Sequence, residues 1–274
     1  MSNWLKKNWK HLLIAVVLLA ACAYSGIKLY QYMAHSVSTR KANEELASLY
    51  EEQKMDSPQE KTEETQPSEQ LSPFLPSYQY IGTSTLPSIA KIQVLNPDTV
   101  AWLYIPGVVN LPVVYRDNIY YLDHDFNGNR SESGSLFLDE NHPFVQDTQY
   151  LVIHGHNWHD GSMFGTLSHY RKNGYMEEHQ KVFLNSLYRE EEYEVIGVLS
   201  VSIDSKDSAY IPYVGIRKFD TIEQFETFRK IIMERALYWA NDARLEPHDA
   251  LLALSTCYKD ERIVVMCRRV SPNF

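Results

Sequence analysis

The sequence has few cysteines and few glycines, and it has no cluster of basic residues. Three cysteines among 274 residues are too few for a disulfide framework, so an exported domain of this composition depends on its hydrophobic core for stability. Without a basic patch, nucleic acid is not expected as a partner. Only 11 glycines stand beside 19 tyrosines, a balance that favours β-strands over a helical bundle.

The hydrophobic content and the charge distribution indicate one folded domain with an acidic appendage. Hydrophobic residues make up 44% of the chain and aromatic residues 12%, which is enough for a core in a chain of this length. The net charge of −9 is unevenly placed, because residues 41–70 hold nine acidic and three basic residues. The remainder of the chain is therefore only mildly acidic.

An uncharged apolar run, residues 12–27, lies close to the N-terminus. It is shorter than the ~20 residues that span a bilayer, but Lys28 can snorkel and the flanks can extend it. Lysines precede the run and aromatic residues flank it, as at a membrane interface: Lys6, Lys7, Lys10, Trp9, Tyr30 and Tyr32. We expect a cytoplasmic N-terminus over residues 1–11, a signal anchor over 12–32 and an extracellular remainder.

Two other interpretations of this segment remain open. A secretory signal could be cleaved near Ala21-Cys22-Ala23, and residues 19–22 resemble a bacterial lipobox, in which the cysteine is lipidated. The apolar run continues past Cys22 to Ile27, which favours an anchor that is not cleaved. Either alternative also leaves the folded domain outside the cell.

Residues 33–77 are predicted to form an extracellular stalk. A patch at 41–53 has helical spacing, and the stretch that follows is rich in proline, serine and glutamate with almost nothing to bury. The folded domain is expected over residues 78–274.

Within that domain, short strand-like runs dominate. A short helix is predicted to end near Asn96-Pro97, followed by a strand at 100–105. Seven further strand-like runs cover 111–115, 133–139, 149–155, 181–186, 191–202, 249–257 and 262–270. Turn signals between these runs predict a barrel or a sandwich. One long helix is expected over 221–243, because Phe225, Phe228, Ile232, Ala236 and Trp239 fall on one stripe.

Histidines gather where one predicted strand ends. His154 and His156 close an apolar run and enter a loop rich in polar residues, the kind of place where a rigid scaffold presents reactive groups. Their spacing could also bind zinc, but His159 and Asp160 are the only further ligands nearby. A metal site is therefore not expected.

Cys257 ends another apolar run, and Arg262 begins the next one. A tight hairpin between them would return the guanidinium toward the thiol, where a cation favours thiolate or stabilises an oxyanion. The alternative is a buried core cysteine, the commoner fate of a free thiol. Strand alternation places Cys267 on the face opposite Arg262, so we interpret Cys267 as a packing residue.

These motifs together resemble class B of the sortases, the membrane-anchored cysteine transpeptidases of Gram-positive bacteria. "LSTC" at 254–257 resembles the active-site motif, "RIVV" at 262–265 begins with the family arginine, and "HGHN" at 154–157 resembles the histidine motif. Further similar stretches lie at 96–107, 111–126, 134–139 and 161–167. The resemblance covers roughly residues 85–270.

The resemblance implies a mainly β fold: a closed eight-stranded sortase-type β-barrel with N-terminal helices and one long helix before the cysteine strand. It assigns catalysis to Cys257 as nucleophile, His156 as proton carrier and Arg262 as the group that holds substrate and oxyanion. Ser255, Thr256 and His154 are expected to bind the substrate peptide, although many class B members carry tyrosine at the position of His154. No cofactor is expected.

The resemblance also implies partners and a reaction. A sorting motif near the C-terminus of a secreted protein would form a thioacyl-enzyme, and an amine of peptidoglycan or of a pilin would resolve it. This sequence departs from the family pattern at one point. Only "YKDE" separates Cys257 from Arg262, and this short loop is expected to narrow one wall of the substrate groove. Two alternatives remain: a cell-wall cysteine peptidase or hydrolase, and a non-catalytic surface-binding module.

Overall fold

The computed structural model describes residues 2–56, 86–142 and 148–270 of the chain. The chain divides into two compact units, Met1–Ala42 and Asn43–Phe274. The helix α1 (Ser2–Asp56) includes the boundary between them. Residues 57–77 of the expected stalk lie outside the described residues, whereas residues 33–56 belong to α1.

The N-terminal unit is helical and apolar. Between Asn8 and Met55, α1 is long and apolar enough to cross a membrane, and it is the one such helix in the described part of the chain. Large side chains from Leu12 to Ile27 are exposed. A continuous exposed apolar surface of this kind calls for an apolar environment, which agrees with the predicted anchor.

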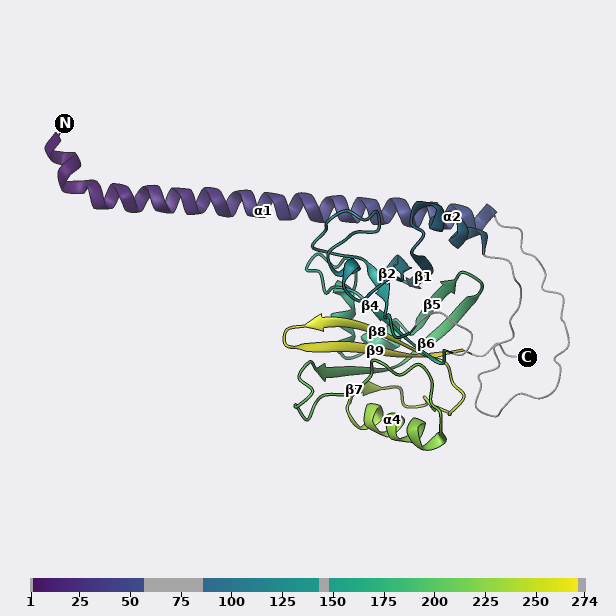
Figure 1. Cartoon of the computed structure of the whole chain (residues 1–274). Helices are drawn as coiled ribbons and strands as arrows, with labels where there is room; N and C mark the ends of the chain where they lie inside the picture. The colour runs from purple at the N-terminus through teal and green to yellow at the C-terminus, as the bar shows by residue number, and fades with distance from the viewer. Residues whose placement is uncertain (1, 57–85, 143–147, 271–274) are drawn as a thin grey trace, which may run out of the picture. The chain divides into compact units, whose positions relative to one another are not determined.

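The second unit contains a closed barrel of eight strands, as predicted (Figure 1). Around the barrel the order is β5 (Lys181–Ser186), β1 (Thr99–Ile105), β2 (Val109–Val114), β3 (Leu136–Leu138), β4 (Tyr150–His154), β8 (Leu251–Tyr258), β9 (Glu261–Arg269) and β6 (Glu190–Ser202). The pairing of β5 with β6 closes the ring. Two pairs, β2–β3 and β4–β8, are parallel, and the others are antiparallel.

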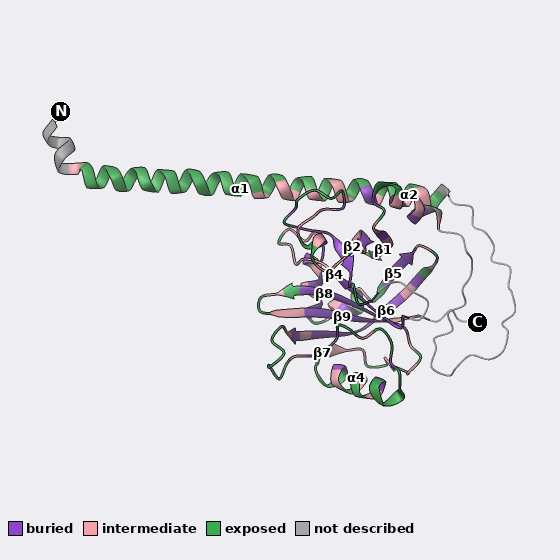
Figure 2. Ribbon diagram, in the orientation of Figure 1, coloured by how far each residue is buried: buried purple, intermediate pink, exposed green. Residues whose placement is uncertain are grey.

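Alternation along each strand separates the barrel interior from its outer face. On β8, Leu252 and Leu254 join the interior cluster, to which all eight strands contribute, whereas Leu251 and Ala253 join a second cluster outside it. The 3-10 helix η2 (Gly165–Arg171) and α3 (Tyr175–Glu178) supply Leu167, Tyr170 and Met176 to the interior cluster. Figure 2 shows the buried residues concentrated in the strands. Side chains of β8 that point away from the barrel interior therefore lie on its outer face, part of which the second cluster covers.

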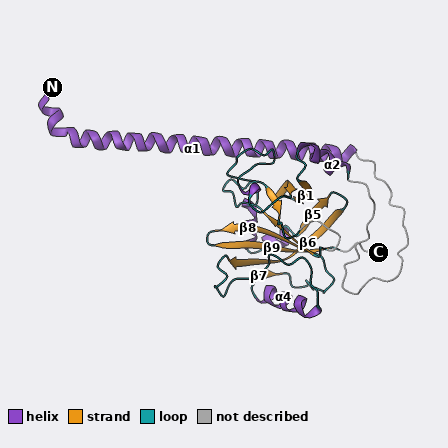
Figure 3. Ribbon diagram, in the orientation of Figure 1, coloured by secondary structure: helices purple, strands orange, loops and turns teal. Residues whose placement is uncertain are grey.

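The helix before the cysteine strand is shorter than predicted. α4 covers Ile222–Glu234, and Ala236–Trp239 form an extra strand, β7, on the free edge of β6 (Figure 3). Phe225, Phe228 and Ile232 are buried as the helical stripe predicts. The prediction of a helix at Ala236 and Trp239 was wrong. These residues form a strand because the unpaired edge of β6 offers them backbone hydrogen bonds, and the aromatic residues here suit a strand.

The end of α1 packs against the barrel together with α2 (Pro87–Leu95), the short helix predicted before Asn96. Tyr50 stacks on Trp102 with ring centroids 4.3 Å apart, and its hydroxyl accepts a hydrogen bond of 2.6 Å from Asn185. Leu46 is buried in the same cluster. The compact unit therefore begins at Asn43, earlier than the expected boundary at residue 78, because helical spacing in 41–53 provides a face that the barrel covers.

Candidate active site

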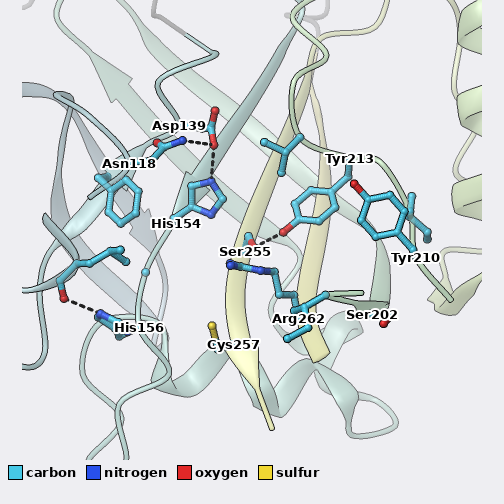
Figure 4. A pocket seen from close by; sticks show the side chains of 16 residues that line it. Asn118, Asp139, His154, His156, Ser202, Tyr210, Tyr213, Ser255, Cys257 and Arg262 are labelled. Atoms are coloured by element: carbon cyan, nitrogen blue, oxygen red, sulfur yellow. Dashed lines mark hydrogen bonds and ion pairs between the residues drawn. The ribbon is translucent and has the colours of Figure 1, made fainter. Parts of the chain in front are cut away.

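A cavity of about 340 Å³ opens on the outer face of the barrel. Its walls come from the ends of β4, β8 and β9, from the segment 118–122, and from the segment between β6 and α4 (Figure 4). His156, Cys257 and Arg262 all line it. The structure thus brings the three expected catalytic side chains into one hollow.

Strand register explains how these three residues meet. In the parallel pair β4–β8, His154 lies opposite Ser255, and the alignment continues because the Gly155 amide donates to the Ser255 carbonyl at 3.2 Å. Two residues further along, the corresponding positions are His156 and Cys257. In the antiparallel pair β8–β9, Cys257 lies opposite Arg262. The strands β8 and β9 and the segment that follows β4 therefore place the residues side by side, with Cys257 in the middle (Figure 4).

A two-residue turn joins the cysteine strand to the arginine strand. Tyr258 pairs with Glu261, which leaves Lys259 and Asp260 as the turn, and Lys259 has a positive φ of 55°. A positive φ at the first turn residue suits the twist of a tight hairpin. This geometry confirms the predicted hairpin that returns Arg262 to Cys257.

The ring of His156 has a defined orientation. Its Nε2 lies 2.7 Å from the carbonyl oxygen of Leu122. Because a carbonyl can only accept, Nε2 must carry the proton, and the Nδ1 of the neutral ring is left as a proton acceptor. A ring held in this way is suited to take a proton and return it.

The two other catalytic candidates, Cys257 and Arg262, are accessible to a substrate. Cys257 is exposed, and no hydrogen bond or ion pair joins the Arg262 guanidinium to another residue in the described ranges. A free guanidinium beside a thiol can bind an anion or a carbonyl oxygen. Cys267 contrasts with both: it is fully buried in the barrel interior, and burial raises the pKa of its thiol. Its predicted role in packing is confirmed.

His154 belongs to a separate polar cluster centred on Asp139. Its Nε2 donates to Asp139 Oδ2 at 2.8 Å, and His142 Nδ1 donates to Oδ1 at 3.1 Å. Burial alone would raise the pKa of Asp139, but the hydrogen bonds from His142, His154 and the Asn141 backbone outweigh it and lower that pKa well below its usual range. Asp139 is therefore ionised. The Nε2 atom of His154 points at Asp139 and that of His156 at the Leu122 carbonyl, so the two rings do not converge on a shared metal position.

The predicted substrate-binding residues divide into two groups. Ser255 and His154 line the cavity, whereas Thr256 is buried and is absent from its lining. The Thr256 hydroxyl donates to the Gly155 carbonyl at 2.8 Å, a contact that ties β8 to the residue before His156. Strand alternation explains the difference, since neighbouring residues on a strand face opposite sides.

Sequence reasoning missed other residues in the cavity wall. Tyr213 approaches Ser255, with their hydroxyl oxygens 2.8 Å apart, and desolvation raises the pKa of Tyr213, so the phenol keeps its proton. Asn118 and Asp139 also line the cavity. For Asp139 the signal was an acidic residue directly after a buried strand. For Tyr213 no local pattern pointed to the site, because it comes from an irregular segment.

Comparisons with known proteins find relatives of this chain. The family model of the sortase domain matches residues 103–270. The chain is 27% identical over 190 residues to sortase B of Listeria monocytogenes, covering 67% of this chain and 74% of the relative. It is 27% identical over 191 residues to sortase B of Staphylococcus aureus, covering 66% and 74%.

Solved structures share the fold. The structure of sortase B from Bacillus anthracis in complex with AAEK1 superposes with a TM-score of 0.68 at 24% identity, covering 87% of this chain and 99% of that chain. The Staphylococcus aureus sortase B–substrate complex superposes with a TM-score of 0.70 at 20% identity, covering 88% and 100%. At these identities, the two likenesses show a shared fold.

Proposed function

Because this chain belongs to the sortase family, we propose that it is a membrane-anchored cysteine transpeptidase that cleaves a sorting motif near the C-terminus of secreted proteins and transfers them to an amine. The family establishes a sortase enzyme; the residues, the intermediate and the partners are our proposal. One observation carries it: Cys257 and Arg262 on the paired strands β8 and β9, and His156 two residues after the end of β4, line one cavity.

In the first half-reaction, Cys257 attacks the carbonyl carbon of the scissile peptide bond. The thiol proton passes to Nδ1 of His156, and a carbon–sulfur bond forms as the carbonyl becomes a tetrahedral oxyanion. The guanidinium of Arg262 would stabilise that charge. The C–N bond then breaks, and His156 returns the proton to the leaving amine, which gives a thioacyl-enzyme.

In the second half-reaction, an amine attacks the thioacyl carbon. His156 accepts a proton from the incoming amine, and the thiolate of Cys257 leaves and regains a proton. The new C–N bond joins the secreted protein to an amine of peptidoglycan or of a pilin. No net oxidation or reduction occurs, so the reaction requires no cofactor.

Ser255, Thr256 and His154 are proposed to serve substrate binding in different ways. Ser255 and His154 line the cavity and can contact the peptide directly. Thr256 acts through its hydrogen bond to Gly155, which holds β4 and β8 in register. The apolar segment of α1 supports attachment to the membrane, with the catalytic domain on the extracellular side.

The test is an amine-capture assay with the full chain in detergent micelles. Peptides that cover C-terminal sorting signals of exported proteins would be incubated with and without triglycine, which is bound in one solved sortase B structure. We expect a peptide–triglycine product by mass spectrometry, and its loss in Cys257→Ala. His156→Gln should reduce the rate by roughly 10²–10⁴-fold and Arg262→Ala by roughly 10²–10³-fold.

Cys267→Ala is the matched control, because it removes the buried thiol and leaves the cavity unchanged. Release of the peptide to water alone at saturating triglycine would favour a hydrolase and contradict the transpeptidase. Cleavage that persists in Cys257→Ala would contradict the nucleophile. If the unsubstituted protein neither cleaved nor bound any sorting peptide, only the surface-binding alternative would remain.

A further inference from the structure

Asp139 is a buried carboxylate at the end of β3 that contacts several parts of the cavity wall. It is 1% exposed, and both of its oxygens are occupied. Oδ1 accepts from His142 Nδ1 at 3.1 Å, from the Asn141 amide at 2.9 Å and from the Asn141 side chain at 3.1 Å. Oδ2 accepts from His154 Nε2 at 2.8 Å and from Asn118 Nδ2 at 3.1 Å. All of these partners are donors to an ionised acceptor.

The same carboxylate is connected to His156 through a short segment. Asn118 is held at both ends of its amide, since its Oδ1 also accepts from the Glu140 backbone at 2.9 Å. Asp117 caps the next residues by accepting from the amides of Ile119 and Tyr120 at 2.9 and 2.7 Å. The 3-10 helix η1 (Tyr120–Leu122) follows directly, and the Leu122 carbonyl accepts from His156. One capped turn therefore separates the Asp139–Asn118 contact from the catalytic ring.

We propose that Asp139 is a positioning residue that sets the tautomers of both imidazoles in the cavity, His154 directly and His156 through Asn118 and the Leu122 carbonyl. In both rings the proton lies on Nε2, and Nδ1 is left as an acceptor. For His156 this is the nitrogen that the proposed function requires, and the inference rests on that function for its catalytic meaning. For His154 it presents an acceptor to the amide N–H groups of a bound peptide.

The substitution Asp139→Asn makes a specific prediction about His154. At the Oδ1 position three donors converge, so the amide oxygen of an asparagine takes that side. Its NH₂ group then faces His154 Nε2 and Asn118 Nδ2, where two donors oppose each other. His154 can restore a hydrogen bond only by moving its proton to Nδ1, which turns its cavity-facing nitrogen from an acceptor into a donor.

The test is long-range ¹H–¹⁵N NMR of ¹⁵N-histidine-labelled full chain in detergent micelles at neutral pH, since protonated and unprotonated ring nitrogens differ widely in ¹⁵N shift. The chain has ten histidines, so His154→Gln and His156→Gln serve to assign the signals. We expect His154 to change from the Nε2–H to the Nδ1–H form in Asp139→Asn. His156 should change from a single Nε2–H form to a mixture, because Asn118 no longer anchors the segment that ends at Leu122.

Asn118→Ala separates the two effects and protects the test if Asp139→Asn does not fold. It removes the link to Leu122 and leaves the Asp139–His154 contact, so only His156 should change. In the assay of the proposed function, both variants should lower kcat by about tenfold to a hundredfold. Asp249→Asn, the same substitution before the opposite end of β8, should alter neither tautomer.

Unchanged tautomers in folded Asp139→Asn, or the same changes in Asp249→Asn, would overturn the proposal. An unchanged His156 tautomer in Asn118→Ala would overturn the proposed indirect effect of Asp139 on His156. The tautomers are read without turnover, so an enzyme that failed to transfer peptide to triglycine would contradict the proposed function and leave this result intact.

Discussion

At the scale of single residues, Gly134 lies where a side chain would disturb His156. Its φ is +59°, and a Cβ there would lie 2.5 Å from the Tyr121 carbonyl oxygen, 2.9 Å from that of Leu122 and 3.1 Å from Cδ2 of His156. Gly134→Ala should therefore displace the acceptor that orients the catalytic ring. We expect kcat to fall by about tenfold to a hundredfold, as for a small misplacement of a reacting group, and the triglycine assay measures it.

The matched control is Gly174→Ala. Gly174 also has a positive φ, +82°, but nothing lies within 4 Å of the position of its Cβ. Both variants pay a similar backbone cost of about 1–2 kcal/mol, so their difference in kcat isolates the effect on His156. Equal losses of kcat would show that backbone strain alone is responsible.

The charge of Asp139 predicts how stability depends on pH. Its pKa is lowered in the folded protein, whereas an unfolded aspartate titrates near 3.9. The stabilisation is therefore fully present above about pH 4 and is lost as the pH falls toward the folded pKa. Asp139→Asn should lower the free energy of unfolding by roughly 2 kcal/mol at pH 7, and urea titrations should show this difference shrinking below about pH 4.

Asp249 provides a control for which stability should depend on pH in the opposite direction. Desolvation raises its pKa in the folded protein, so its carboxylate is disfavoured by folding at neutral pH. Relative to Asp249→Asn, the unsubstituted protein should gain stability as the pH falls, the reverse of the Asp139 pair. A difference between protein and Asp139→Asn that stays constant from pH 7 to pH 3 would contradict the assignment of an ionised buried carboxylate.

Individual residues differed in how far the sequence could place them. The hairpin that brings Arg262 back to Cys257 could be predicted, because the two residues lie at strand ends joined by a short turn. The catalytic roles of His156, Cys257 and Arg262 were expected from the resemblance to the sortases. Asp139 and Asn118 could not, since their roles depend on hydrogen bonds between a loop and a strand that are distant in the sequence. Thr256 was assigned to the peptide groove, yet strand phase turns it inward.

At the scale of elements, periodicity predicted the eight barrel strands but not the end of α4. Residues 236–239 continue the helical stripe by spacing, and only the free edge of β6 decides that they form β7. Gly197 permits this pairing, because a Cβ there would lie 2.5 Å from Cε3 of Trp239. Pairing with β6, a tertiary contact that no local sequence pattern predicts, thus overrides the helical spacing.

Gly197→Ala should therefore loosen β7 and leave the barrel closed. We expect faster amide hydrogen exchange in residues 236–239, with unchanged protection in β1 and β2. A double-mutant cycle with Trp239→Ala checks the cause, because removal of the indole should cost less free energy in the Gly197→Ala background than alone. Additive effects would contradict a direct clash between the two residues.

At the scale of the whole molecule, the boundary between tether and domain differs from the one that composition suggests. Composition predicts a stalk over residues 33–77, but α1 already contributes to the folded unit from Asn43 onward. Sequence spacing showed that 41–53 can form a helix. It could not show that Trp102 and Asn185, far along the chain, supply the partners for Tyr50.

Two soluble truncations test this boundary. A chain that begins at residue 43 keeps the helical turns carrying Leu46 and Tyr50, whereas one that begins at 78 exposes the Trp102 ring and leaves the buried Asn185 amide without its acceptor. Loss of a buried aromatic side chain costs about 3–5 kcal/mol, so the shorter chain should unfold at a clearly lower urea concentration. Tyr50→Ala in the longer chain should account for most of the difference. Equal stability of both chains would mean that α1 serves the folded domain only as a tether.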